Sequence, residues 1–364
     1  MDGATAIVRG ALDAKCTFFA GYPITPASQI LMAMMRDLPR QGGVAVQGED
    51  EIASIGMCIG AVMGGARAMT ATSGPGMSLY SENLGLAVMG EIPLVVVDVQ
   101  RMGPATGAAT TVGQGDVQFA RWGTSGGYPL IVLAPSSVPE CYTLTVRAFD
   151  LAERFRCPVV LLTDKELNLT MRTVASADFV APRVGDRPAP TGEGDRPYRY
   201  EPPGAVPPMR RFGDERVRFT GSTHDERALI TKDPEVVGAL NRHLAAKIDE
   251  HTDEIEMVAS DLQDGADTLV ISYGITAGAA RSAAAEMRAA GRAVSVATVH
   301  SLWPVPERSL REAMTEVRRV VVAELNLGQY RREIEPLAGA REVVGVHRVD
   351  GELIAPEEIA EAVG

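Results

Sequence analysis

Four short segments in the first third of the chain contain residues that could bind or activate a small molecule. They read AGYPITPAS over residues 20–28, EDEIAS over 49–54, TATSGPGMS over 70–78 and VVVDVQRMGPATG over 95–107. Each segment contains or follows a run of apolar residues that predicts a buried β-strand. Ligands of parallel α/β sheets bind at the carboxyl ends of the strands, so these four segments are the candidates for a binding site.

Glu51 is a candidate for a catalytic acid or base. It begins the apolar sequence EIASIGMCIGAVMGG, which predicts a buried helix over residues 51–64. Acids are favourable at helix N-termini because of the helix dipole, but Glu49 and Asp50 can fill that solvated role. A buried carboxylate at position 51 would have a raised pKa and could share a proton with a ring nitrogen. An ordinary acid at a helix start is the alternative.

Thr25 and Arg101 are candidates for binding a carboxylate. Pro26 suits the first position of a helix predicted over residues 26–38, which makes Thr25 the N-cap beside free backbone N–H groups. Arg101 follows a largely apolar strand predicted over residues 94–99, where its guanidinium could bind a carboxylate through two parallel hydrogen bonds. The alternatives are a simple helix cap for Thr25 and a structural ion pair for Arg101.

The sequence TSGPG at residues 72–76 predicts a turn between a strand and a helix over residues 77–89. Its glycines permit close approach of the backbone to a ligand, and the helix start offers N–H groups. No Lys follows, so the segment is not a P-loop, and the spacing is not that of a dinucleotide fingerprint. A tight turn without a ligand is the alternative.

Charge and cysteine usage exclude several classes of protein. The net charge of −12 argues against a nucleic-acid partner, which requires a clustered basic face. No apolar run approaches the roughly 20 residues of a membrane helix, and no secretory signal is visible, so we expect a cytoplasmic protein without a membrane partner. No CxxC spacing occurs, so we expect buried thiols and not metal ligands at Cys16, Cys58, Cys141 and Cys157.

The chain is predicted to have three parts. Residues 1–180 alternate helical patterns with continuous apolar strands, which indicates an α/β domain whose parallel sheet has helices on both faces. Residues 181–250 form a connecting region, and the Pro-, Gly- and Arg-rich stretch 181–225 predicts an extended arm, with a disordered linker as the alternative. Residues 251–364 indicate a second parallel α/β domain, with strands predicted over 268–274, 293–299, 319–325 and 341–346.

The order of these segments closely resembles that in the α subunit of 2-oxoacid:ferredoxin oxidoreductases. YPITP, an acidic residue that begins an apolar helix, TSGPG and VQRxGPxTG follow one another as in that family. The second half also resembles the family, in GSTHDER at 221–227, LWPVP at 302–306 and ELNLGQ at 324–329. The resemblance implies a thiamine-diphosphate-binding pyrimidine domain, a connecting arm and a C-terminal α/β domain similar to that of transketolase.

The resemblance also implies roles for individual residues. Glu51 would contact N1′ of the aminopyrimidine ring of thiamine diphosphate, and Thr25 and Arg101 would hold the carboxylate of the substrate. Ser125 stands where the 2-oxoglutarate branch often has a His, and is therefore the candidate for substrate choice. Further cofactor contacts would come from Tyr22, Pro23, Ile24, Ser73, Gly74, Pro75 and Gly76.

The function implied by the resemblance is oxidative decarboxylation of a 2-oxoacid, with 2-oxoglutarate as the preferred substrate. Coenzyme A would be acylated, CO2 released and the electrons passed to ferredoxin. The sequence contains neither a GDG followed by a distant Asn, typical of a Mg2+–diphosphate site, nor cysteines spaced for an iron–sulfur cluster. Both are expected on a separate β subunit, without which this chain would be inactive, and a separate γ subunit is expected as well.

Three other functions compete with this prediction. A branched-chain or other 2-oxoacid could be the substrate, and a non-catalytic scaffold could have descended from the same family. The joint presence of Thr25, Glu51 and Arg101 argues against the scaffold, which needs none of them. A dinucleotide-dependent dehydrogenase is disfavoured because GYPITP stands where its glycine fingerprint would be.

Overall fold

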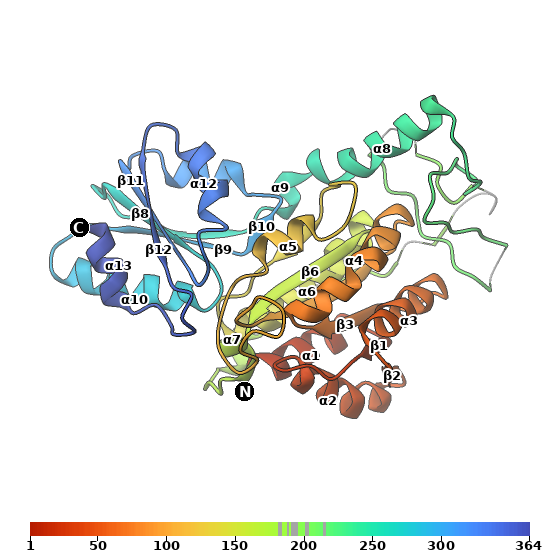
Figure 1. The fold of residues 1–364 in the computed structure, drawn as a ribbon, viewed down its shortest axis with the longest axis horizontal. Coiled ribbons are helices and arrows are strands. Elements are labelled where there is room, and N and C mark those ends of the chain that lie inside the picture. The colour runs from red at the N-terminus through yellow and green to blue at the C-terminus, as the bar shows by residue number, and fades with distance from the viewer. Residues whose placement is uncertain (181–183, 188, 191–195, 201–203, 214–215) are drawn as a thin grey trace.

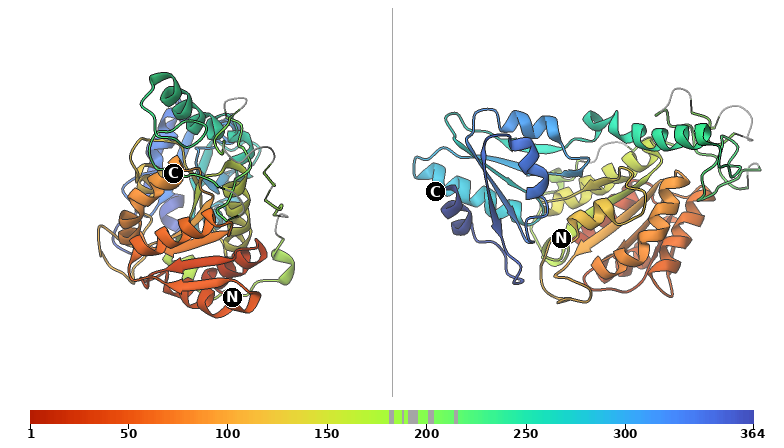
Figure 2. Two further views of the ribbon diagram at one scale, coloured as in Figure 1. Left: turned by 90° about the vertical axis from the view of Figure 1, so that its right-hand side faces the viewer. Right: turned by 45° about the horizontal axis from the view of Figure 1, so that its top comes forward.

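Two α/β domains lie side by side in the chain, and a long connection between them runs along one edge of the molecule (Figure 1). The structure is a computed structural model, and it describes residues 1–180, 184–187, 189–190, 196–200, 204–213 and 216–364. Two further views show that the second domain packs directly against the first (Figure 2). A single apolar cluster contains buried residues of both domains, such as Val96 and Val160 of the first and Leu269 and Val322 of the second.

The sheet of the first domain has seven strands in the order β10-β5-β6-β4-β3-β1-β2. All neighbouring strands are parallel except β10, which comes from the second half of the sequence and pairs antiparallel with β5. The predicted parallel sheet is therefore confirmed apart from this edge strand. The strands are β1 (Phe18–Gly21), β2 (Val44–Gln47), β3 (Ala68–Thr72), β4 (Leu94–Gln100), β5 (Ile131–Leu133), β6 (Pro158–Asp164) and β10 (Ser301–Trp303).

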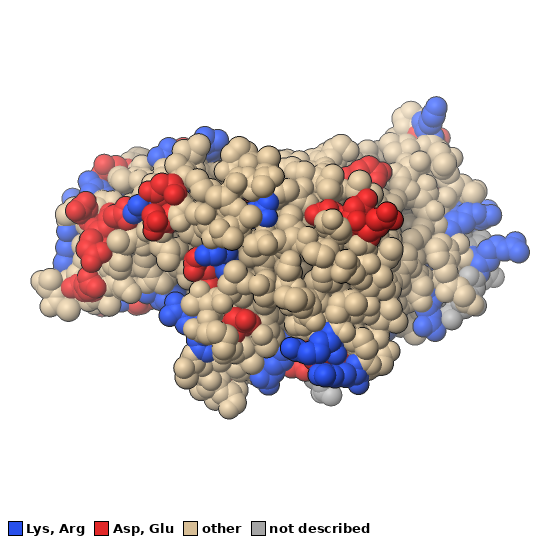
Figure 3. All heavy atoms as spheres, turned by 60° about the horizontal axis from the view of Figure 1, so that its bottom comes forward, with Lys and Arg blue, Asp and Glu red and all other residues tan. Residues whose placement is uncertain are grey.

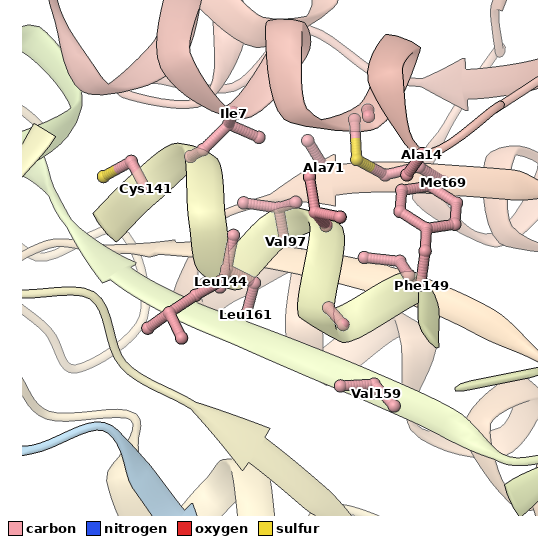
Figure 4. Packing of buried hydrophobic residues seen from close by; sticks show 14 of the residues in the cluster. Ile7, Ala14, Met69, Ala71, Val97, Cys141, Leu144, Phe149, Val159 and Leu161 are labelled. Atoms are coloured by element: carbon pink, nitrogen blue, oxygen red, sulfur yellow. The ribbon is translucent and has the colours of Figure 1, made fainter. Parts of the chain in front are cut away.

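Helices cover both faces of this sheet, because the strand side chains alternate between two apolar layers. Val95 and Val97 of β4 face one layer, which includes Cys141 and residues from α1 (Gly3–Asp13), α2 (Ser28–Asp37) and α6 (Val138–Phe155). Figure 4 shows α1 and α6 packed over the sheet in this layer. Leu94 and Val96 face the other layer, with α3 (Glu51–Met63), α4 (Gly74–Met89) and α5 (Val117–Trp122).

The start of α2 differs from the prediction. The helix begins at Ser28, its N-cap is Ala27, and no side chain caps it, so Thr25 is not the N-cap. The reason is that a tight turn precedes the helix, in which the N–H of Ser28 donates to the carbonyl of Ile24 (2.9 Å). Conversely, α4 begins at Gly74, three residues before the predicted start, with Ser73 as its N-cap.

Several described parts of the connecting region pack against the first domain. The guanidinium of Arg187 donates two hydrogen bonds of 2.7 Å to the carboxylate of Glu153. Farther along, the Tyr198 hydroxyl donates to the carbonyl of Gly90 at 3.2 Å. These contacts agree with an extended arm. The region also contains α8 (Pro234–Asp249), a helix that was not predicted, although Asp233 caps it and Pro234 occupies its first turn.

Glu91 fastens both the arm and α8 to the first domain. Its carboxylate is completely buried and accepts hydrogen bonds from the Tyr200 hydroxyl (2.5 Å), His243 Nε2 (3.0 Å) and Lys247 Nζ (3.1 Å). Burial alone would raise the pKa of Glu91, but Lys247, His243 and Arg156 outweigh it and hold that pKa below its usual range. A buried carboxylate with this many donors is a structural anchor.

The second sheet has five strands in the order β12-β11-β8-β9-β7, and only β7 is antiparallel to its neighbour. The four strands that were predicted here are parallel, as expected, and β7 is an additional edge strand that was not predicted. Helices again cover both faces, α10 and α13 on one and α11 and α12 on the other. The elements are α9 (Thr252–Ile255), β7 (Val258–Asp261), β8 (Thr268–Ser272), α10 (Thr276–Ala289), β9 (Ser295–Val299), α11 (Glu307–Ala313), β11 (Arg319–Glu324), α12 (Arg331–Ala338), β12 (Glu342–His347) and α13 (Pro356–Val363).

The remaining short elements are α7 (Lys165–Leu169), which follows β6 directly, and two single-turn helices at Pro39–Gln41 and Ser176–Asp178. Among the residues described, no helix combines the length and the apolar character that spanning a membrane requires.

Candidate active site

The four segments that could carry chemistry lie together at one edge of the first sheet. They follow strands β2, β1, β3 and β4, which are consecutive neighbours in that sheet. Because these strands are parallel, all four carboxyl ends meet at the same edge. The spatial grouping expected from the sequence is therefore present.

Glu51 lies buried at this edge, directly against the TSGPG turn. Its side chain is only 6% exposed, and the capping role at the start of α3 belongs to Asp50, which accepts the Ala53 N–H at 2.7 Å. A Cβ atom built on Gly76 would lie 2.8 Å from Glu51 Oε1 and would overlap the hydroxyl oxygen of Thr72. Gly76 is therefore the residue that lets the Glu51 carboxylate approach the first turn of α4.

The N-terminus of α4 carries polar groups that its own helix does not use. Ser73 is buried at the N-cap, yet its hydroxyl makes no capping bond and has no hydrogen-bond partner among the described residues. A Cβ on Gly74 would lie 3.0 and 3.1 Å from the two carboxylate oxygens of Asp116. The first turn of α4 is thus surrounded by the free Ser73 hydroxyl and by the carboxylates of Glu51 and Asp116.

Arg101 and Thr25 are brought together, but through a contact that the sequence did not predict. Arg101 is 6% exposed, and its Nη1 donates to the backbone carbonyl of Thr25 at 2.5 Å, whereas Nη2 donates to the carbonyl of Thr106 at 3.1 Å. Its Nε has no acceptor among the described residues, and no carboxylate there forms an ion pair with it. Thr25 itself is exposed, so its hydroxyl remains accessible from outside the chain.

A cavity of about 590 Å³ opens beside Arg101. One wall consists of the loop over residues 101–116 and the start of α4, and the other is the turn over residues 325–329 of the second domain. The second wall is fixed by side-chain amides, since Asn326 Nδ2 donates to the carbonyl of Gln114 and Gln329 Nε2 to that of Gly115, both at 2.7 Å. The ELNLGQ sequence therefore shapes the site, a role that its sequence alone did not reveal.

Two buried acids at this edge were missed by sequence reasoning. Asp98, on β4, is completely buried, and neither of its carboxylate oxygens has a hydrogen-bond partner among the described residues. Burial raises the pKa of Asp98 well above its usual range, and the nearby Asp116 carboxylate raises it further. Burial also raises the pKa of Asp116 to about 6, although Arg101 acts in the opposite direction. The available signal was an Asp inside the apolar strand LVVVDVQ.

The other predicted cofactor residues lie in two loops at this edge of the sheet. Tyr22 and Pro23 are exposed after β1, and Ile24 is partly buried and packs against the core. Pro75 lies in the first turn of α4 and, with Gly74, lines the cavity beside Arg101. Of these two segments, the start of α4 lies directly against Glu51, through Gly76.

Ser125 is not brought to this cavity. It lies in an exposed loop after α5, and its neighbours contact the middle of α4: Ser81 donates a hydrogen bond to the carbonyl of Gly123, and Thr124 lies against Gly85. It does not line the cavity beside Arg101. A role in substrate choice would require that another chain bring the substrate to this loop.

The cysteines are buried thiols, as predicted. All four are free, and each is at most 4% exposed. Burial raises the pKa of the Cys16 and Cys157 thiols to about 12, so these thiols are not nucleophiles at neutral pH. In the part of the chain that the structure describes, no group of three or more His, Cys, Asp or Glu side chains is placed to hold a metal ion.

Comparison with protein families matches both domains. The family model described as "Pyruvate flavodoxin/ferredoxin oxidoreductase, thiamine diP-bdg" matches residues 9–243, and "Pyruvate:ferredoxin oxidoreductase core domain II" matches residues 266–359. The first model alone spans more than half of the chain, and its description names the thiamine-diphosphate-binding domain.

Curated relatives match over nearly their whole length. The 2-oxoglutarate synthase subunit KorA of Methanothermobacter marburgensis is 44% identical, with 99% of this chain and 96% of the relative covered. KorA of Methanocaldococcus jannaschii is 41% identical, with 100% and 98% covered. The ketoisovalerate oxidoreductase subunit VorB of Methanothermobacter thermautotrophicus is 35% identical, with 99% and 96% covered.

Solved structures confirm the fold and the resemblance. The 2-oxoglutarate:ferredoxin oxidoreductase from Magnetococcus marinus, with 2-oxoglutarate, coenzyme A and succinyl-CoA bound, superposes with a TM-score of 0.92 at 32% identity. All of this chain is covered, but only 65% of that longer chain. A split-gene transketolase, at 14% identity and a TM-score of 0.55, shares the fold. The chain therefore belongs to the 2-oxoacid:ferredoxin oxidoreductase family, in which it is an α subunit with a thiamine-diphosphate-binding domain.

Proposed function

We propose that this chain is the α subunit of a 2-oxoglutarate:ferredoxin oxidoreductase that converts 2-oxoglutarate and coenzyme A to succinyl-CoA and CO2, with ferredoxin as electron acceptor. The observation that carries the proposal is the burial of Glu51 against Gly76, at the edge of the sheet where Arg101 also lies. The assignment of the substrate is supported by four 2-oxoglutarate synthase subunits KorA, which are 41–44% identical, whereas two VorB relatives and the KorA of Mycobacterium tuberculosis are 33–35% identical. A branched-chain 2-oxoacid is therefore the second candidate.

The residues at the Glu51 edge fit the aminopyrimidine ring of thiamine diphosphate. Gly76 lets the Glu51 carboxylate approach the first turn of α4, and the buried Ser73 hydroxyl in the same turn is available as a hydrogen-bonding group. We assign further contacts to Tyr22, Pro23 and Ile24 in the loop after β1, which ends at the same edge of the sheet. When bound, thiamine diphosphate supplies the reactive carbon that adds to the 2-oxo carbon and retains the electrons left after CO2 departs.

Glu51 holds a proton at N1′ of the pyrimidine ring in this proposal. Its burial removes competing water, and its position at the first residue of α3 directs the carboxylate toward the first turn of α4. A carboxylate in such an environment can donate and recover a proton without the reorganisation of solvent.

Arg101 binds the carboxylate next to the 2-oxo group. Two of its nitrogens are held by the carbonyls of Thr25 and Thr106, which fix the guanidinium in place, and Nε remains as a donor. The accessible Thr25 hydroxyl supplies a second donor from the facing loop. The distal carboxylate of 2-oxoglutarate needs a further donor, and Ser125 remains our prediction for a contribution to substrate choice.

The β subunit is proposed to cover α3. This helix is apolar on every side, which is typical of a helix that is buried all round, yet Ile52 is 50% and Met57 40% exposed. On the same exposed side, a Cβ added at Gly56 or Gly60 would meet nothing within 4 Å. Large parts of the surface in Figure 3 are likewise uncharged. Because Glu51 begins α3, a chain that covers this helix also lies beside the cofactor site.

The remaining groups of the enzyme are assigned to partners. We place the Mg2+–diphosphate site and the 4Fe–4S cluster on the β subunit and expect a separate γ subunit. The four free thiols are consistent with a cytoplasmic location, where disulfides are rare. The domain limits that we propose are 1–180, 181–250 and 251–364.

The test is turnover of the complex assembled from this chain and its β partner. With Glu51→Gln, we expect thiamine diphosphate to remain bound while turnover falls by roughly 10²–10⁴, the usual contribution of a positioned acid or base. Glu49→Gln, which changes an exposed carboxylate two residues away, is the matched control and should leave turnover unchanged. Near-normal turnover in Glu51→Gln would refute the assignment of Glu51.

A further inference from the structure

Asp98 and Asp116 form a pair of carboxyl groups beneath Arg101. Along β4, Asp98 lies on the same face as Val96 and Gln100, which is the face covered by α4 and α5. Asp116 immediately precedes α5, and its backbone N–H donates to Gln100 Oε1 at 3.1 Å. The two acids are thus neighbours across one strand face, three and fifteen residues from Arg101 in the sequence.

The hydrogen bonding of this pair is incomplete. Among the described residues, no donor reaches Asp98 Oδ1, Asp98 Oδ2 or Asp116 Oδ2, although all three oxygens are buried. A buried carboxylate without donors is strongly unfavourable, and two of them side by side are more so. The pair becomes acceptable when one proton is shared between the two groups.

Within the described residues, Arg101 is the only cationic neighbour of this pair, and the other charged groups nearby are acids. Arg101 acts directly on the Asp116 carboxylate. From the neighbouring strand β6, Asp164 faces the same layer, but its carboxylate accepts the N–H groups of Leu167 (3.0 Å) and Ile275 (2.8 Å). Glu51 approaches from α3, at the other side of the first turn of α4. With one proton on the pair, its single negative charge balances Arg101.

We propose that Asp98 and Asp116 share one proton in the free enzyme and take up a second when a carboxylate ligand binds at Arg101. This inference rests on the proposed role of Arg101 in substrate binding. A carboxylate that pairs with the guanidinium neutralises the only cation near the pair and adds a negative charge to a weakly screened site. The pair then responds by binding a proton from solvent, so ligand affinity is linked to pH.

The linkage has a definite sign and range. Because Asp116 has a pKa of about 6 in the free chain, it is ionised above that pH and can accept a proton on ligand binding. Carboxylate affinity should therefore weaken as pH rises above about 6, by up to tenfold per pH unit. Asp98 and Asp116 are positioning residues in this scheme, since they act through Arg101.

The experiment measures proton uptake by the assembled complex on binding glutarate, which carries both carboxylates of the substrate but cannot be decarboxylated. Calorimetry at pH 7.0, in buffers of different ionisation enthalpy, counts the protons. We expect close to one proton per glutarate for the wild type and close to none for Asp116→Asn, whose remaining acid, Asp98, is already protonated. Asp98→Asn keeps the accepting carboxyl group of Asp116 and should retain the uptake. Asp264→Asn, an exposed acid of the second domain, is the matched control and should retain the uptake.

A second readout separates positioning from a general loss of structure. In Asp116→Asn, KM for 2-oxoglutarate should lose its pH dependence between about pH 6.5 and 8, whereas kcat at saturation should change little. Absence of proton uptake in the wild type, or the same uptake in Asp116→Asn as in the wild type, overturns the inference. Failure of the wild-type complex to oxidise any 2-oxoacid refutes the proposed function instead, because glutarate binding is measured without turnover.

Discussion

Gly76→Ala tests the contact on which the cofactor site depends. The substitution adds one methyl group at the third residue of α4, where the new Cβ would lie 2.8 Å from Glu51 Oε1 and overlap the Thr72 hydroxyl oxygen. Thr72 belongs to the buried strand β3, whereas the Glu51 carboxylate is the end of a longer, flexible side chain, although Glu51 is only 6% exposed. The Glu51 carboxylate must therefore move away from the turn.

The expected cost follows from two opposing contributions. Replacing a helical Gly by Ala favours the folded state by about 0.5–1 kcal/mol, because the unfolded chain loses conformational freedom. Overpacking a closely packed site costs about 1–3 kcal/mol. The free energy of unfolding should thus fall by roughly 1–2 kcal/mol, a small effect for a buried substitution. Turnover should fall much more, on the order of 10²-fold, because a displacement of about 1 Å at a catalytic group has that effect.

Gly278→Ala is the matched control. Gly278 lies in α10 of the second domain, where an added Cβ meets nothing within 4 Å, so the same chemical change should stabilise the chain by about 0.5–1 kcal/mol. Urea denaturation of the full chain measures both stabilities, and turnover of the assembled complex measures the displacement of Glu51. A Gly76→Ala complex that turns over within about twofold of the wild type would show that the Glu51–Gly76 contact is unimportant.

Two further predictions concern charged groups. Glu91→Gln should lower the free energy of unfolding by about 3–5 kcal/mol at pH 7, because Lys247 loses its buried partner. The control is Glu254→Gln, which removes the exposed ion pair with Arg154 and should lower the free energy of unfolding by about 1 kcal/mol or less. Since the pKa of Glu91 is lowered in the folded chain, its contribution to stability is present above about pH 4.5 and is lost as pH falls. The difference in free energy of unfolding between wild type and Glu91→Gln, measured by urea denaturation, should therefore be smaller at pH 4 than at pH 7. An unchanged difference would contradict this reasoning. Arg101→Lys should raise KM by roughly 10–100-fold for 2-oxoglutarate, pyruvate and 2-oxoisovalerate alike, because a Lys ammonium cannot keep both bonds to the Thr25 and Thr106 carbonyls and also donate to the carboxylate that these substrates share. An effect on one substrate alone would show that Arg101 does not bind the shared carboxylate. Arg36→Lys, on the exposed face of α2, is the control.

The sequence predicted the framework of the fold because its physical signals are local. Strand β4, for example, is apolar at five of its seven residues and lies between loops, which is typical of a parallel strand buried on both faces. Where several local structures fit one signal, the prediction was wrong: Thr25-Pro26 is compatible with a helix cap and also with a turn before the helix, and the bond from Ser28 to Ile24 favours the turn. The antiparallel strands β7 and β10 were unpredictable for a different reason, since strand direction at an edge depends on pairing with distant residues.

The helix α8 was missed although its sequence carries the usual signals. Asp233 accepts N–H groups of the first turn and Pro234 occupies the first position, as the pattern KDPEVV indicates. The Pro- and Arg-rich stretch that precedes the helix is typical of an extended arm, and its composition obscures the helical signal that follows. What holds α8 in place is the buried carboxylate of Glu91, more than 150 residues earlier, which no local pattern connects with it.

The buried acids show how structure separates an anchor from a functional group where sequence cannot. Glu91 and Asp98 both stand next to or within apolar runs, and both are completely buried. Glu91 is surrounded by three side-chain donors, so its charge is balanced and its role is to hold the arm and α8. Asp98 has no donor among the described residues and lies beside a second acid and beneath the arginine that faces the cavity. An arrangement that costs stability without a compensating contact is expected at functional sites, and Asp98 is therefore the acid whose removal should change ligand binding more than folding.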